Sequence, residues 1–178
     1  MVLFNILFFG CVTVSLVVAS LTQPSPLYTG YNPNVPGFLL GDGWPIAFLG
    51  IFSFNLVLSS FLYLTLTGLV LFPLSAIFLV YRGFLWGMVL YALPVEVFVL
   101  ALSTIVLEGE AYVFAAVAGT LLGASWTKAL RLYRVEELSR FRALKMALKE
   151  CCRIYVFTTI LLFAAAFAET ITMILFSS

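Results

Sequence analysis

Long apolar runs separated by short polar stretches dominate the chain. The first run covers residues 2–22, and about twenty apolar residues in a helix are enough to cross the roughly 30 Å hydrocarbon core of a bilayer. The second run, residues 46–93, has the length of two crossings, with Gly68 and Pro73 marking the expected turn. The pattern predicts transmembrane helices over residues 2–22, 46–69 and 73–92.

Residues 23–45 separate these runs and are rich in proline, glycine and asparagine, the residues of turns and loops. Tyr28, Tyr31 and Trp44 are of the type that gathers where a membrane meets water. We expect an exposed loop that lies against the membrane surface. The run before it is longer than the apolar region of a signal peptide and has no basic residues ahead of it, so we expect it to be retained.

Residues 94–127 are too long for one crossing and short for two, and Glu108, Gly109 and Glu110 interrupt their middle. One interpretation is a half-helix over residues 95–106, a break, and a spanning helix over residues 110–127. Irregular backbone at membrane depth is tolerated only inside the protein or beside water, so this break would be internal. The other interpretation is two short tilted helices with the acidic cluster at an aqueous surface.

Basic residues are concentrated in residues 128–153, which hold eight of the nine Lys and Arg residues; the ninth is Arg82. Apolar and basic side chains occupy neighbouring sectors of a helical wheel here, as in amphipathic helices that bind anionic membranes. We expect a cytoplasmic amphipathic helix, followed by the last crossing over residues 154–176. The predicted contacts with lipid headgroups come from Arg142, Lys145, Lys149 and Arg153.

The composition excludes an ordinary soluble domain. Of the 178 residues, 63% are hydrophobic and 10% are charged, against about 45–50% and about 25% in soluble domains. Continuous apolar runs favour helices over the alternating strands of a membrane barrel. We predict one all-α transmembrane domain over residues 1–178, with about five spanning helices.

The basic segment also predicts an orientation, because cytoplasmic loops of membrane proteins carry an excess of Lys and Arg. With five crossings, the N-terminus is cytoplasmic, and the 23–45 loop and the C-terminus lie outside. Six crossings would move the N-terminus outside and the loop inside. The loop contains no basic residue, which favours five.

Several kinds of chemistry lack the residues they need. The chain has no histidine, and its three cysteines form no CxxC pair, so we expect no metal site and no cofactor. It also has no nucleotide-binding loop and no nucleophile motif. We therefore expect a protein that is not an enzyme and that does not bind nucleic acid.

A few polar side chains fall inside the apolar runs, where an ionisable group costs about 2.5–3.5 kcal/mol at the bilayer centre. One hypothesis is that the glutamates are protonatable members of an ion or proton path. The alternative is that Arg82 and Glu169, or a similar pair, are structural while the other glutamates lie near the outer surface or in a hydrated dip. The candidate residues are Asn55, Arg82, Glu96, Glu108, Glu110 and Glu169.

Small residues mark expected helix contacts. Ala115, Gly119 and Gly123 recur every four residues, a spacing that lets two helix backbones approach closely, within the bundle or between protomers. Glu169 follows a run of alanines, so we expect its carboxyl to bond to a neighbouring helix and not to face lipid.

Four local patterns resemble the stage II sporulation protein M family over most of the chain. They are the segment from Ile51 to Leu56, Arg82-Gly83 with Gly87, Glu110-Ala111-Tyr112 running to Gly123, and the small-residue run that ends at Glu169. The chain departs from the family pattern at three points. It has only Asn55 where relatives have paired asparagines, Arg82 where they have asparagine, and Glu108-Gly109 where they often have His-Gly.

In spore formers, the family member works in a membrane complex with partners that cut the cell wall, without being the hydrolase. The resemblance therefore implies a non-enzymatic scaffold or complex subunit, with membrane lipids and other membrane proteins, or further copies of the chain, as partners. A channel or transporter subunit that uses the intramembrane glutamates is the alternative.

Overall fold

The computed structural model describes residues 1–22, 43–93, 95–126 and 140–177, and these residues contain helices and no strand. In chain order, the elements are α1 (Val2–Thr22), α3 (Trp44–Ser53), η1 (Phe54–Leu66), α4 (Thr67–Val70), α5 (Phe72–Ala92), α6 (Val95–Trp126) and α7 (Arg140–Ser177). Five helical segments of this described part are long and apolar enough to cross a membrane. The chain is thus a multi-pass membrane protein of the predicted all-α class.

The first three crossings begin and end close to their predicted positions. α1 covers Val2–Thr22, and the second crossing runs without interruption through α3, η1 and α4. The turn falls at Leu71, which is extended (φ −148°, ψ 109°), and Pro73 lies in the first turn of α5. A proline is tolerated there because the first helical N–H groups have no partner within the helix. The 23–45 loop lies outside the described residues except for its last three.

The middle of the second crossing is a π-helix, η1. Its backbone bonds span five residues, whereas an α-helix bonds across four. Accordingly, its buried side chains are four and five residues apart, at Asn55, Ser59, Ser60, Leu64 and Thr65. Four of these five are polar, so η1 presents a polar stripe to the inside of the bundle.

The third region corrects both interpretations of residues 94–127. α6 is a single unbroken helix of 32 residues, with no half-helix and no break at Gly109. Gly109 is buried, and a Cβ atom at this position would clash with the ring of Phe8 on α1. The acidic pair does not interrupt the helix because the backbone keeps its own hydrogen bonds, and the Glu108 carboxyl finds partners on neighbouring elements.

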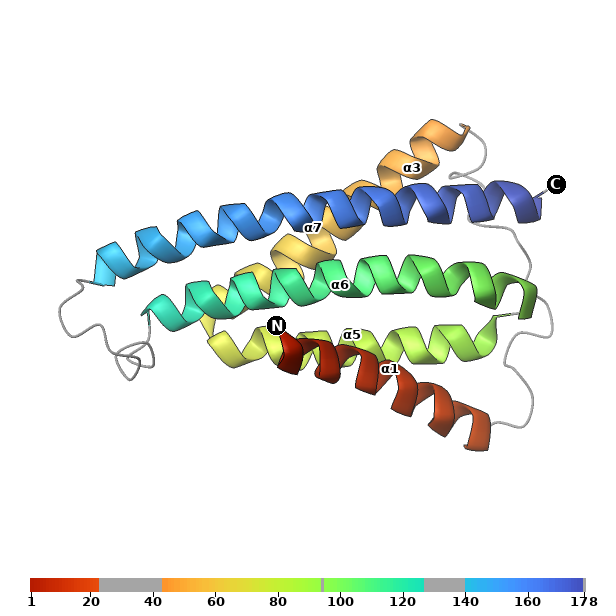
Figure 1. Cartoon of the computed structure of the whole chain (residues 1–178), viewed down its shortest axis with the longest axis horizontal. Helices are drawn as coiled ribbons and strands as arrows, with labels where there is room; N and C mark the ends of the chain where they lie inside the picture. Colours follow the sequence, from red (N-terminus) through yellow and green to blue (C-terminus); the bar gives the residue numbers. More distant parts are fainter. Residues whose placement is uncertain (23–42, 94, 127–139, 178) are drawn as a thin grey trace.

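The last region is also continuous. α7 has 38 residues, about 57 Å at 1.5 Å per residue, so the predicted amphipathic helix and the last crossing are parts of one rod. Residues 128–139 lie outside the described part of the chain. Near the start of α7, Leu144, Ala147 and Cys151 pack with Ala118 and Leu122 of α6. The beginning of α7 and the end of α6 extend beyond the turn between α4 and α5 (Figure 1).

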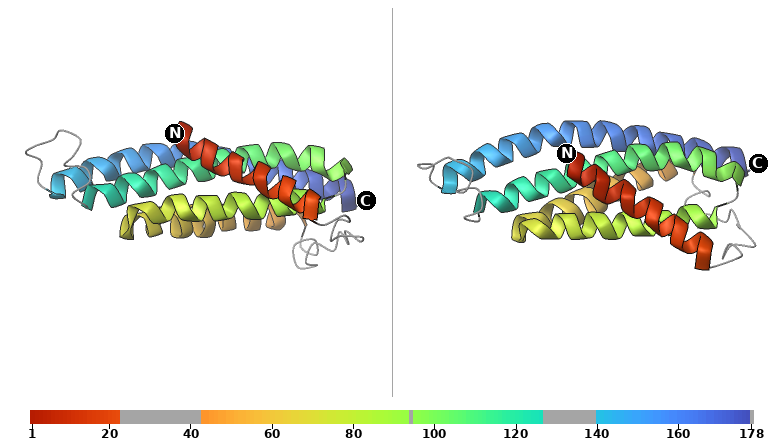
Figure 2. Two further views of the ribbon diagram at one scale, coloured as in Figure 1. Left: turned by 90° about the horizontal axis from the view of Figure 1, so that it is seen from below. Right: turned by 60° about the horizontal axis from the view of Figure 1, so that its bottom comes forward.

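α6 is the central helix, because it packs against α1, α4, α5, α7 and η1. α1 crosses α5 and α6 obliquely, as both views in Figure 2 show. Gly83 and Gly87 of α5 allow this approach: a Cβ atom on Gly83 would lie 2.6 Å from the carbonyl oxygen of Phe8. The end of α1, the starts of α3 and α6, and the ends of α5 and α7 lie at the same end of the bundle (Figure 1).

Candidate functional site

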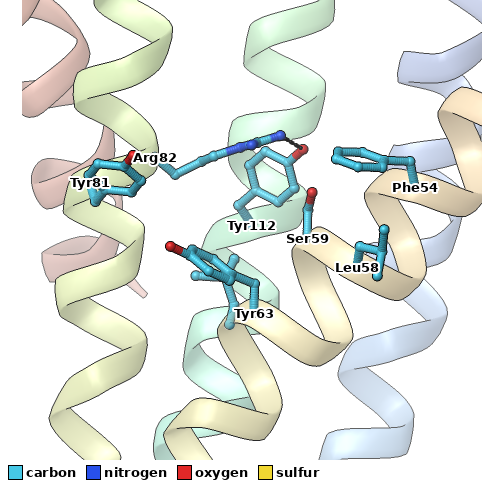
Figure 3. Close-up of a pocket in the computed structure, with 8 residues that line it drawn as sticks. Phe54, Leu58, Ser59, Tyr63, Tyr81, Arg82 and Tyr112 are labelled. Carbon is cyan, nitrogen blue, oxygen red and sulfur yellow. Dashed lines mark hydrogen bonds between the residues drawn. The ribbon is translucent and has the colours of Figure 1, made fainter.

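The buried polar residues of the bundle converge at the middle of α6. Glu108 and Tyr112 are four residues apart, so they lie on the same face of α6, and they are 1% and 0% exposed. Asn55 reaches them from the first turn of η1. Arg82, the middle residue of α5, reaches them from the other side (Figure 3). We call these four residues the polar cluster.

Hydrogen bonds join all four members of the polar cluster. Asn55 Nδ2 donates to Oε1 of Glu108. The Tyr112 hydroxyl lies 3.0 Å from Asn55 Oδ1 and 3.4 Å from Glu108 Oε2, and it accepts a hydrogen bond from Arg82 at 3.0 Å. Because the four residues come from η1, α5 and α6, the polar cluster ties three elements together at one depth.

Arg82 makes no ion pair with a described carboxylate, which corrects the expectation of a direct Arg82–Glu169 pair. Its guanidinium lies 5.0 Å from the centre of the Tyr112 ring and 6.0 Å from that of Trp86. The Tyr112 hydroxyl connects it to Glu108, since this hydroxyl lies 3.0 Å from Arg82 and 3.4 Å from Glu108 Oε2. Glu150 and Arg153, both exposed on α7, form an ion pair at 2.7 Å.

The remaining glutamates lie apart from the polar cluster. Glu169 is partly buried on α7, and no described side chain hydrogen-bonds to its carboxyl. Glu110 is partly exposed at the middle of α6. The side chain of Glu96, in the first turn of α6, lies outside the described part. The hypothesis that these glutamates lie near the outer surface is therefore wrong for Glu108, which is interior.

Two pockets of about 260 Å³ each are lined in part by α5: Arg82 lines the first, and Trp86, four residues later, lines the second. The first, the η1 pocket, is lined by Arg82 and Tyr112 together with Phe54, Leu58, Ser59 and Tyr63 of η1 (Figure 3). The second, the α7 pocket, lies between α5, α6 and α7 and is lined by Trp86, Thr104 and Glu169 among mostly apolar side chains. Arg82 hydrogen-bonds to Tyr112 in the first pocket, and its guanidinium lies 6.0 Å from the centre of the Trp86 ring, which lines the second.

The predicted small-residue ridge packs inside the bundle. A Cβ atom on Gly119 would lie 2.7 Å from the carbonyl oxygen of Leu64, and one on Gly123 would clash with that of Gly68. The carbonyl oxygen of Ala115 accepts a hydrogen bond from Thr65 at 2.9 Å. The ridge thus serves contact within one chain, between α6 and the second crossing.

The four basic residues proposed for lipid contact, Arg142, Lys145, Lys149 and Arg153, are all exposed on the first half of α7.

The described residues contain no group of three His, Cys, Asp or Glu side chains that could hold a metal ion. The hydrogen bonds of the polar cluster hold η1, α5 and α6 together through side chains of the chain itself.

Sequence reasoning missed Tyr112, Trp86 and Thr104 as parts of the polar interior. Tyr112 could have been found from its spacing of four residues from Glu108. Trp86 likewise follows Arg82 by four residues, but a tryptophan in an apolar run gives no polar signal. Thr104 precedes Glu108 by four residues, but threonine is common in membrane helices, so its presence does not indicate a polar site.

A family model described as stage II sporulation protein M matches residues 2–172, nearly the whole chain. The chain belongs to this family, as its local patterns predicted. No curated protein and no solved structure matches it.

Proposed function

We propose that this chain is a non-enzymatic subunit of a membrane protein complex, a scaffold that docks a partner helix on the outer stripe of α6. The observation that carries the proposal is Glu110. It is the sixteenth of the 32 residues of α6 and is partly exposed, and no described residue hydrogen-bonds or ion-pairs with it. Val99, Ser103 and Val106, on the same stripe, are also exposed.

A carboxyl at this depth calls for a partner. An acidic side chain at the bilayer centre costs about 2.5–3.5 kcal/mol, and such side chains almost always face protein or water. In contrast, the Glu108 carboxyl, two residues earlier, is already bonded to Asn55. Glu110 is thus a carboxyl near the middle of the membrane that a side chain of another protein chain can reach and bind.

The chemistry of Glu110 favours a different protein over a second copy. Two copies related by an axis along the membrane normal would bring their Glu110 side chains to the same depth, where like charges repel. The one described cation near this depth, Arg82, points into the polar cluster. The partner that fits is a membrane-spanning helix with an arginine, lysine or amide side chain near its middle.

The basic half of α7 supports the predicted orientation. Its exposed Arg142, Lys145 and Lys149 suit a cytoplasmic surface with anionic lipid headgroups. In this orientation the N-terminus is cytoplasmic and the C-terminus lies outside. The length of α7 would carry these side chains beyond the hydrocarbon core, toward the cytoplasm.

The test compares Glu110→Leu with Glu150→Leu, which makes the same change on an exposed part of α7. Both variants are expressed in native membranes, extracted gently and sized by native mass spectrometry. We expect wild type and Glu150→Leu in a complex heavier than the 19.7 kDa chain, and Glu110→Leu as the free subunit. A complex that survives Glu110→Leu, or a wild-type protein found only alone, overturns the proposal. A complex made only of identical chains overturns the proposal of a different protein as the partner and shows that a second copy of this chain docks instead.

The second candidate is a channel or transporter subunit. One observation favours it: ionisable side chains line both pockets, Arg82 the η1 pocket and Glu169 the α7 pocket. Chains of ionisable residues in membrane proteins often carry ions or protons. The purified chain in liposomes should then conduct protons or small ions, and Arg82→Met should change the rate. No flux in wild type across a range of ion and pH gradients rules this candidate out.

A further inference from the structure

The α7 pocket contains polar groups that the bundle leaves without partners. Trp86 Nε1 and Thr104 Oγ1 are buried, and neither has a hydrogen-bond partner in the described structure. Thr104 is only 5% exposed. Both residues line the pocket together with Glu169, whose carboxyl also lacks a hydrogen bond from the described residues. Buried polar groups are normally paired, so two buried unpaired groups beside the partly buried Glu169 carboxyl give this cavity the means to bind a polar ligand.

The charges around the pocket define the sign of this ligand. Glu169 is the ionisable residue in the lining of the α7 pocket, and Arg82 forms no ion pair with it. Arg82 is held toward Glu108 by its hydrogen bond to Tyr112. Among the described residues, the Glu169 carboxyl therefore has no cation of its own, and a ligand that forms an ion pair with it must bring a positive charge.

The rest of the lining defines the body of the ligand. Most of the remaining side chains are apolar, including Val89, Leu93, Ile105 and Met173. The volume of about 260 Å³ falls just below the range of about 300–1,000 Å³ typical of pockets for drug-sized ligands. A bare metal ion would find few oxygen ligands here, whereas an alkyl chain would displace water from apolar walls.

We propose that the α7 pocket binds a small amphipathic organic cation, a protonated amine whose alkyl body carries a hydrogen-bond acceptor such as a hydroxyl group. The ammonium group pairs with Glu169. The acceptor receives hydrogen bonds from Trp86 Nε1 and the Thr104 hydroxyl. This site is independent of the docking stripe on α6, and it exists whether or not the ligand crosses the membrane.

The test measures binding to the full chain in nanodiscs of uncharged lipid by isothermal titration calorimetry. The probes are 6-aminohexan-1-ol, the neutral hexan-1-ol and the anion 6-hydroxyhexanoate, which share one chain length. We expect saturable binding of the amine and at least about tenfold weaker binding of the other two, because only the amine can pair with Glu169. Equal binding of hexan-1-ol would show that the pocket binds alkyl chains without recognising the ammonium group, and it would overturn the proposal.

Variants separate the two halves of the site. Glu169→Gln should weaken amine binding at least about tenfold, since it removes the charge and keeps the shape. Glu150→Gln makes the same change on an exposed turn of the same helix and should bind as wild type. If Glu169→Gln does not fold, Trp86→Phe and Thr104→Val test the acceptor half; each should lower affinity about fivefold, and unchanged binding in both overturns the proposal.

Because Glu110 is not in the α7 pocket, failure of the docking experiment leaves this test unaffected. Binding of the amine with no complex formation would support the pocket alone, and complex formation without amine binding would support the docking stripe alone.

Discussion

The Tyr112 hydroxyl joins the polar cluster, and removing it is the sharpest test of the cluster's energetic role. In Tyr112→Phe, the ring stays in its buried position, with its edge contact to Phe8 and its stacking beneath Arg82. Only the oxygen is lost. Arg82 then loses the acceptor at 3.0 Å, and Asn55 Oδ1 loses the donor at 3.0 Å.

The magnitude follows from these two hydrogen bonds. In membrane proteins, a side-chain hydrogen bond between helices contributes about 0.6 kcal/mol on average and about 1.7 kcal/mol at most. Leaving a buried group unpaired costs about 1–3 kcal/mol. The two losses at Tyr112 should therefore destabilise the fold by about 1–3 kcal/mol.

The assay is reversible unfolding in mixed micelles, titrated with a denaturing detergent and followed by circular dichroism. Tyr63→Phe is the matched control, because Tyr63 lines the same η1 pocket but its hydroxyl has no described hydrogen bond. It should change stability by less than about 0.5 kcal/mol. If Tyr112→Phe is as stable as this control, the hydroxyl does not hold the cluster together. A double-mutant cycle with Asn55→Leu should also be non-additive, because both changes remove the same bond.

Two further outcomes are expected. Gly119→Ala should destabilise the fold by about 1–3 kcal/mol in the same unfolding assay, because its Cβ would lie 2.7 Å from a backbone oxygen. Gly10→Ala is the control: a Cβ atom at Gly10 would have no atom within 4 Å, so this change should be neutral or slightly stabilising. In a cysteine-free background, a membrane-impermeant maleimide should label Trp44→Cys only from outside and Lys149→Cys only from the cytoplasm; labelling of both from one side would contradict the five-crossing arrangement.

The number and limits of the crossings could be predicted because they depend on local properties. A span needs about twenty apolar residues, and the runs at residues 2–22 and 73–92 have that length. The turn at Leu71 could be predicted because Pro73 disfavours a helix continuing through the residues before it.

The continuity of α6 could not be predicted in the same way. A Glu-Gly-Glu sequence in an apolar run indicates a break as long as only its neighbours in sequence are considered. The helix continues because Asn55, fifty-three residues earlier, bonds to Glu108, and Phe8 fills the space beside Gly109. Tertiary contacts of this kind override the conformational preference of the local sequence. The Glu108 carboxyl, which suggested a break, instead joins α6 to η1.

The π-helix decides which residues share the buried face with Asn55, and the sequence pattern does not reveal it. An α-helical period would place Leu58 and Leu62 on the same face as Asn55, yet both are at least 40% exposed. Ser59 would share the face of Asn55 in either kind of helix, whereas the wider turn also brings Ser60 and Thr65, five and ten residues after Asn55, to the buried face. Because π-helical turns are rare and occur frequently at functional sites, the polar stripe on η1 argues that this crossing is shaped to line the polar interior as well as to span the bilayer.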